Sequence, residues 1–420
     1  MYSLLTRRKI LLIAFLVETI CVTYALKLKF LTGFTSIAFT ISGLFICWFA
    51  LVLPSPEQVP NKPFDLAKIT NKYRWWILAM TLICIIGSAL HWMEDAPLDY
   101  HDADMLPIIK IMSERFIHGA WSHVYDVIPE IWGGMHPIYL PAMWLPFSIP
   151  VFFNADPRWT TVVALFLLTS LFIWRIQPLH RKSGPIFFAA FLLIWWLLNA
   201  HNSGLLIYTE EGVVILFYSF LTLSLLSKNG WLIGMATSLC VLSRYSLVGW
   251  IPAMLVFYLY TKDFKNLLRI VLMGVLFFIV LVLIPFGWKT FLTLTSIPSE
   301  YISFSERVWK DAPVVFHESL GFAKFFGPKN IALQHHLLIY SALLIPTIFM
   351  VICLALTKRF HLQKDHLPIA TLKITLVIFY SLVDVPYLYL FYTGSFLSLF
   401  LVTHLLVGER PIWSQKKSLT

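Results

Sequence analysis

The sequence predicts an all-α, polytopic integral-membrane protein of the type that has about twelve transmembrane helices and no separate soluble domain. Two observations support this fold class. Of the 420 residues, 59% are hydrophobic and only 13% are charged, whereas about 25% of the residues of a soluble domain are charged. Apolar runs such as 267–285 and 337–356 approach the roughly 20 residues that a helix needs to cross the hydrocarbon core.

Basic residues indicate the orientation of the predicted helices in the membrane. Lysine and arginine gather in short clusters between apolar runs, as in loops that stay on the cytoplasmic side. This arrangement predicts one domain over 1–420 with both termini in the cytoplasm, and long outer loops at 92–158 and 288–333. The predicted spans cover about 10–26, 31–53, 75–91, 159–176, 185–201, 206–227, 231–243, 246–261, 267–287, 335–357, 367–386 and 388–407.

The net charge of +10 is scattered among these clusters and forms no single basic stripe. The charge therefore indicates a lipid bilayer as partner and no nucleic acid. The five cysteines all fall inside apolar segments, without a pairing or metal-binding pattern, and are interpreted as small core residues.

The first outer loop contains two elements of its own. Residues 105–117 (MLPIIKIMSERFI) place apolar side chains at helical spacing, with Lys110, Glu114 and Arg115 opposite them, which predicts an amphipathic helix on the membrane interface. Residues 138–151 carry three prolines, so this segment is too short and too broken for a span and is predicted to be re-entrant or interfacial. If it were a full span, every later basic cluster would lie outside.

Asp102 and Asp104 are the first candidates for chemistry. They follow a predicted membrane exit by about a dozen residues and stand just before the interfacial helix. This position holds a carboxylate at the level of the lipid headgroups. Together with Ala103 they also form a DxD sequence, which in nucleotide-sugar enzymes suggests a divalent metal. Because no nucleotide-binding domain is present, a metal is the less favoured interpretation and no cofactor is predicted.

Arg244 is the second candidate, because it interrupts two apolar runs without an acidic neighbour in sequence. A buried arginine is costly unless it pairs with a carboxylate or binds an anion. Guanidinium geometry suits phosphate oxygens, so a phosphate anchor at the outer face is one interpretation. Glu210 and Glu211, at the outer start of their helix, either pair with Arg244 or line the same cavity.

The order of several short motifs resembles the GT-C superfamily of integral-membrane glycosyltransferases. The likeness is greatest to glycosyltransferase family 87, whose members use polyprenyl-phosphate mannose. The resemblance covers about residues 75–330. The matching segments are 104–109 (DMLPII), 116–119 (FIHG), 124–126 (VYD), 136–141 (HPIYLP), 232–244 (LIGMATSLCVLSR) and 317–321 (HESLG).

This resemblance implies a transferase that moves a hexose, with mannose as the first candidate, from a polyprenyl-phosphate donor to a glycan or glycolipid acceptor at the outer face of the cell inner (plasma) membrane. Asp104 would be the general base, with Asp102 as the second choice. Arg244, with Lys110 or His136, would hold the donor phosphate. The remaining candidates would line the substrate site: Tyr100, His101, Tyr139, Glu210, Glu211, His317 and Glu318.

The strongest competing hypothesis is a polytopic transporter or flippase for a lipid-linked or amphipathic substrate. Such a protein would carry ionisable residues within its midplane helices and an inverted repeat. No repeat is seen, but Glu18 and Asp384 lie within predicted helices and keep this hypothesis open. An O-antigen polymerase or ligase, and a non-catalytic partner in an envelope complex, are also compatible with the sequence. The sequence contains no GxxxxGK[ST] segment, so an ATP-driven pump is not indicated.

Overall fold

The computed structural model describes residues 2–54, 65–131, 134, 136–175, 192 and 204–407. Within these residues the chain is helical and contains no β-strand, which confirms the all-α prediction. The helices are α1 (Tyr2–Thr23), α2 (Thr32–Val52), α3 (Asp65–Asp95), α4 (Met105–Ile117), α5 (Pro141–Trp144), α6 (Ser148–Phe152), α7 (Trp159–Arg175), α9 (Gly204–Ile207), α10 (Glu211–Ser227), α11 (Gly230–Val241), α12 (Ile251–Thr261), α13 (Phe264–Phe278), α14 (Ile284–Ser296), α15 (Tyr301–Asp311), α16 (Val314–His317), α17 (Ala323–Phe326), α18 (Ile331–Phe360), α19 (Leu367–Leu382) and α20 (Phe391–Val407).

Six helical segments of the described chain are long and apolar enough to cross a membrane, as expected of a membrane protein. They are Lys29–Val52, Trp75–Asp95, Phe264–Ser296, Ile331–Phe360, Lys364–Leu382 and Leu388–Leu406. Several other apolar helices, such as Trp159–Ile173 and Glu211–Ser227, are shorter than this length. The span predicted at 185–201 lies outside the described residues, apart from Leu192.

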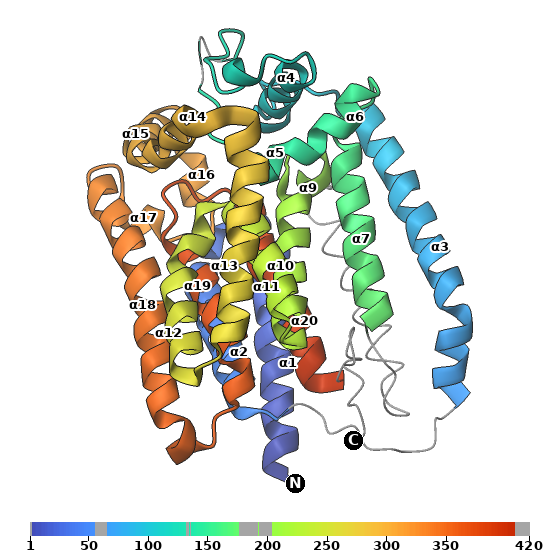
Figure 1. Cartoon of the computed structure of the whole chain (residues 1–420), viewed down its shortest axis with the longest axis vertical. Helices are drawn as coiled ribbons and strands as arrows, with labels where there is room; N and C mark the ends of the chain where they lie inside the picture. Colours follow the sequence, from blue (N-terminus) through green and yellow to red (C-terminus); the bar gives the residue numbers. More distant parts are fainter. Residues whose placement is uncertain are drawn as a thin grey trace.

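The helices stand roughly side by side, and one end of the bundle is covered by α4, α5, α6 and α14 to α17 (Figure 1). We call this the capped end. The start of α1 lies at the other end. Lys29, in the turn between α1 and α2, forms an ion pair with Glu318 at 3.3 Å, so this turn belongs to the capped end. At the other end Gln363 N donates to Leu51 O over 2.7 Å, which joins the α18–α19 turn to the end of α2.

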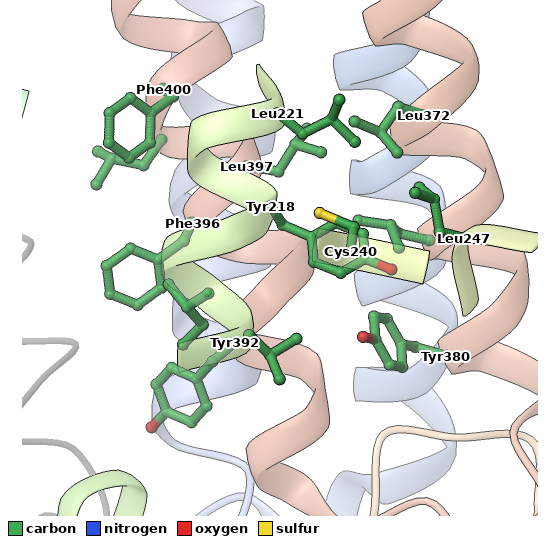
Figure 2. Packing of buried hydrophobic residues seen from close by; sticks show 14 of the residues in the cluster. Tyr218, Leu221, Cys240, Leu247, Leu372, Tyr380, Tyr392, Phe396, Leu397 and Phe400 are labelled. Atoms are coloured by element: carbon green, nitrogen blue, oxygen red, sulfur yellow. The ribbon is translucent and has the colours of Figure 1, made fainter. Parts of the chain in front are cut away.

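The central helices pack on all sides, whereas the outer helices do not. Over an apolar stretch of 18 residues, 83% of the residues are buried in the Leu388–Leu406 segment but only 6% in the Phe264–Ser296 segment. Figure 2 shows the central packing, in which Tyr218, Tyr380 and Phe396 come from α10, α19 and α20. A helix that is apolar all round and leaves its side chains uncovered is suited to a lipid environment.

Close backbone approach explains one glycine of this core. A β-carbon at Gly249, in the 3₁₀ helix Tyr245–Trp250, would lie 2.4 Å from the carbonyl oxygen of Ala342 in α18. The 3₁₀ helix therefore sits directly on α18 only because residue 249 has no side chain.

The two segments predicted to be outer loops both contain several helices. Helix α4 covers 105–117, and the proline-rich 138–151 segment breaks into α5, the 3₁₀ helix Leu145–Phe147 and α6. In the segment 288–333, α14 continues to Ser296 beyond a kink at Gly287, and α15 to α17 follow. The φ of +73° at Gly287 turns the chain two residues after Pro285, at the place where the predicted span ends.

Candidate functional site

Arg244 is the centre of a buried ionic cluster at the junction of α11 and the following 3₁₀ helix. Its Nη2 donates to Glu210 Oε1 at 2.8 Å and also to Glu211 Oε2. Thr393, in α20, donates to the other oxygen of Glu211. The two glutamates have almost no exposed surface. Their turn separates α9 from α10, so the predicted 206–227 helix is interrupted at the point where it supplies these carboxylates.

One guanidinium serves two carboxylates in this cluster, which leaves one buried negative charge in excess when all three groups are ionised. Burial raises the pKa of Glu210 above its usual value, and the charge of Arg244 partly opposes this shift. Arg244 Nε and Glu210 Oε2 are buried and have no hydrogen-bond partner among the described residues. Two polar atoms of the cluster thus remain available for a bound molecule.

Asp104 lies close to this cluster. It stands at the N-terminus of α4, half-buried, while Leu106, Ile109 and Met112 pack the helix down on its neighbours. Burial raises the pKa of Tyr139 well above its usual value, and the charges of Glu210 and Asp104 raise it further. The same carboxylate, after burial, contributes to raising the pKa of Tyr387 to about 12. Asp104, Tyr139, Glu210 and Tyr387 therefore share one electrostatic environment.

The segment 383–389, between α19 and α20, borders the same place. Burial raises the pKa of Tyr301 to about 12, and Tyr301 also lies within electrostatic reach of Arg244, Asp384 and Glu210. Asp384 is 4% exposed and its Oδ2 lies 2.8 Å from His335 Nδ1. The rings of Tyr387 and Tyr389 stack, with centroids 5.6 Å apart at 15°. The sequence analysis assigned Asp384 to a helix and did not include this segment in the site; the signal for it was a single carboxylate two residues before a proline in an apolar run.

The other predicted residues of the first loop have different surroundings. Asp102 is exposed in a turn, and His101 is exposed, with its Nδ1 2.8 Å from Asp99 and its ring centroid 4.0 Å from that of half-buried Tyr100. The hydrogen bonds from His101 hold the pKa of Asp99 below its usual range. His136 is exposed. These side chains lie at the surface of the capped end, whereas the Arg244 cluster is buried.

Lys110 lies in a separate groove of about 640 Å³ between α4 and the α6–α7 connection. Its ammonium is 3.9 Å from Glu114. Arg158 on the same groove is 2% exposed, and its Nη1 donates to Ala96 O at 2.6 Å. The bond to Ala96 O caps the end of α3, and the ion pair of Arg158 with Asp156 fixes the chain just before α7. Lys110 therefore lines this groove, whereas Arg244 pairs with the two glutamates, and the phosphate site of Arg244 with Lys110 or His136 stays a prediction.

His317 and Glu318 also have other partners. The exposed ring of His317 meets the edge of Trp309 at 5.5 Å, and Glu318 pairs with Lys29. In the described part of the chain, no group of three or more histidine, cysteine, aspartate and glutamate side chains is arranged to hold a metal ion.

The residues thus define a class: a helical membrane protein with a half-buried carboxylate, a buried guanidinium–carboxylate cluster and several tyrosines gathered at one end. No protein-family model, no curated protein and no solved structure matches this chain.

Proposed function

We propose that this chain is an integral-membrane glycosyltransferase of the GT-C type. It moves a hexose, with mannose as the first candidate, from a polyprenyl-phosphate donor to a hydroxyl group of a glycan or glycolipid. The proposal includes about twelve spans, both termini in the cytoplasm and the capped end on the outer face of the cell inner membrane. The observation that carries it is the shared electrostatic environment of Asp104, at the start of the interfacial helix, and the Arg244 cluster.

The reaction needs few groups. The acceptor oxygen attacks the anomeric carbon while the bond from that carbon to the phosphate oxygen breaks, and the electron pair of that bond leaves with the lipid phosphate. The proton of the acceptor hydroxyl passes to the carboxylate of Asp104, which is the general base. Arg244 interacts with the departing phosphate through guanidinium nitrogens other than Nη2, which the two glutamates occupy.

The surroundings of Arg244 fit a fixed anion site. A guanidinium held by two carboxylates cannot swing away, so its Nε keeps one direction when a phosphate arrives. A proton retained on the pair of glutamates leaves the cluster neutral, which lowers the repulsion of an incoming phosphate. The burial that raises the pKa of Glu210 favours this protonated form.

The transporter hypothesis depends on Glu18 and Asp384. Glu18 is fully buried and paired with Lys373 at 2.7 Å, which makes it a contact between helices. Asp384 lies outside the helices, at the capped end beside Tyr301. Neither position favours a transport pathway over the transferase.

The proposal is tested by a transfer assay on membranes that contain the wild type or a single variant. Radiolabelled polyprenyl-phosphate mannose or glucose is the donor, and an extract of native lipids and glycans supplies the acceptor. We expect Asp104→Asn to reduce transfer by about 10²–10⁴-fold at unchanged protein level. Asp311→Asn, an exposed carboxylate at the end of α15, is the matched control. Loss of transfer in Asp102→Asn alone would identify Asp102 as the general base. Absence of transfer by the wild type from either donor would contradict the proposal.

A further inference from the structure

Asp384 is a buried carboxylate that the proposed chemistry does not use. Its Oδ2 lies 2.8 Å from His335 Nδ1, but its Oδ1 is buried without a hydrogen-bond partner among the described residues. Buried polar atoms of a folded protein normally have partners, and half of a buried carboxylate left without one is costly. Contact with His335 alone does not explain why the second carboxylate oxygen, Oδ1, is buried without a partner among the described residues.

The segment that carries Asp384 is held in place by its own carbonyl groups. Helix α19 ends at Leu382, and the chain then runs without helical hydrogen bonds to Tyr387. Gln334 Nε2 donates to the carbonyls of residues 382 and 383 at 3.1 and 2.9 Å, and Ser305 Oγ donates to Asp384 O at 2.9 Å. The side chain of Asp384 is therefore fixed before any ligand arrives.

Two further hydrogen bonds hold the same backbone, and we call the whole set of bonds to the carbonyl groups of residues 381–386 the clamp. Ser319 Oγ donates to Pro386 O at 2.5 Å, and Phe322 N donates to Ser381 O at 2.7 Å. A β-carbon at Gly321 would come within 2.6 Å of the Pro386 ring, so the second loop packs directly on this segment. The contacts come from α15, the α16–α17 connection and α18, and they all converge on one short stretch of backbone.

The clamped segment lies near both the proposed base and the proposed phosphate anchor. Tyr387 is within electrostatic reach of Asp104, and Tyr301 is within reach of Asp384, Arg244 and Glu210. Tyr387 and Tyr389 add a pair of stacked rings on the same segment. A fixed carboxylate oxygen accepts hydrogen bonds from neighbouring hydroxyl groups, and tyrosine rings offer an apolar face with a polar tip. A sugar ring needs both kinds of contact.

We propose that Asp384, held by His335 and accompanied by Tyr387 and Tyr389, forms the subsite that binds the hydroxyl groups of the hexose on the donor lipid. This inference rests on the proposed transferase function and adds the residues that select the sugar. Asp384 Oδ1 accepts from hydroxyls of the hexose, and His335 is a positioning residue that orients the carboxylate through Oδ2.

The test is a binding measurement with two lipids, made on the full chain in lipid nanodiscs. Polyprenyl-phosphate mannose and polyprenyl phosphate without a sugar are titrated against the wild type, Asp384→Asn and the control Asp311→Asn. We expect the wild type and the control to bind the sugar-bearing lipid at least about tenfold more tightly, because the sugar hydroxyls donate to a charged group. In Asp384→Asn this preference is lost, while affinity for polyprenyl phosphate is unchanged.

An unchanged preference for the sugar-bearing lipid in a folded Asp384→Asn protein would overturn the subsite but leave the transferase standing. If the wild type binds neither lipid, both proposals fail together. Should Asp384→Asn not fold, as judged by size-exclusion chromatography, Tyr387→Ala provides the same comparison, since it removes one stacked ring and is expected to reduce the same preference.

Discussion

The carboxylate of Glu18 in α1 lies 2.7 Å from the ammonium group of Lys373 in α19, and neither side chain has any exposed surface. Lys373 also donates to Gly394 O at 3.0 Å, and Ser398 donates to Glu18 at 3.1 Å. Because both charges have partners on every side, this pair joins α1, α19 and α20 in the centre of the bundle.

Removing one member of this pair is expected to destabilise the fold more than removing both. Glu18→Gln or Lys373→Met alone leaves a buried charge without its partner, and we expect a cost of about 3–5 kcal/mol in the free energy of unfolding. The double variant leaves no buried charge and should lose less than the sum of the two. Thermal unfolding of the four proteins in detergent measures this coupling; additive losses would contradict it.

The Arg244 cluster allows a structural role to be separated from a catalytic one. Arg244→Met leaves Glu210 and Glu211 without a counter-charge, so we expect poor folding and no transfer. Adding Glu210→Gln and Glu211→Gln removes both carboxylates and is expected to restore the unfolding temperature. Transfer should stay absent, because the phosphate anchor is still missing. Recovery of transfer together with folding would show that Arg244 only stabilises the fold.

The close approach at Gly249 predicts a steric effect. Gly249→Ala would push a methyl group against the carbonyl of Ala342, and we expect a loss of about 1–3 kcal/mol in the free energy of unfolding. Gly87→Ala in α3 is the matched control, since nothing lies within 4 Å of its added β-carbon. Alanine also favours a helix over glycine, so the control should be neutral or slightly stabilising. Equal effects of the two substitutions would be inconsistent with the packing.

Lys324 in α17 predicts a dependence of stability on pH. Burial lowers its pKa from 10.5 to about 8, while its ammonium donates to Ser319 O at 2.6 Å. Between pH 8 and 10.5 the unfolded chain binds more protons at this residue than the folded one, so its contribution to stability rises with pH. We expect the difference in unfolding temperature between the wild type and Lys324→Gln to shift in favour of the wild type from pH 7.5 to 9.5. A shift in the opposite direction would refute the assignment.

Local patterns predict local structure well in this chain. The amphipathic spacing of 105–117 matches α4, and the prolines of 138–151 match the three short helical pieces there. The pairing of Arg244 with Glu210 and Glu211 is one of the two interpretations that the sequence allows, because a buried guanidinium needs an anion.

What the sequence does not predict depends on contacts between distant segments. From their positive charge alone, Lys110 and Arg244 are expected to share one site. The way in which α4 packs places Lys110 in the groove beside Arg158. The apolar pattern places Asp384 in a helix, because nothing local shows that Gln334 and Ser305 would satisfy the carbonyl groups of a broken one. Pro285 and Gly287 mark a break that the sequence shows, but not that α14 continues beyond the kink to Ser296.

The clamp on the 381–386 carbonyl groups has a consequence for biosynthesis. Asp104, Glu210 and Arg244 are synthesised well before Tyr387 and Thr393, which lie near the end of the chain. Glu211 therefore lacks its contact with Thr393, and Asp104 lacks its neighbour Tyr387, until the last helices have been synthesised. A ribosome-bound nascent chain that stops before α19 would expose an unfinished charged cluster within the lipid, and would be a natural substrate for membrane quality-control proteases.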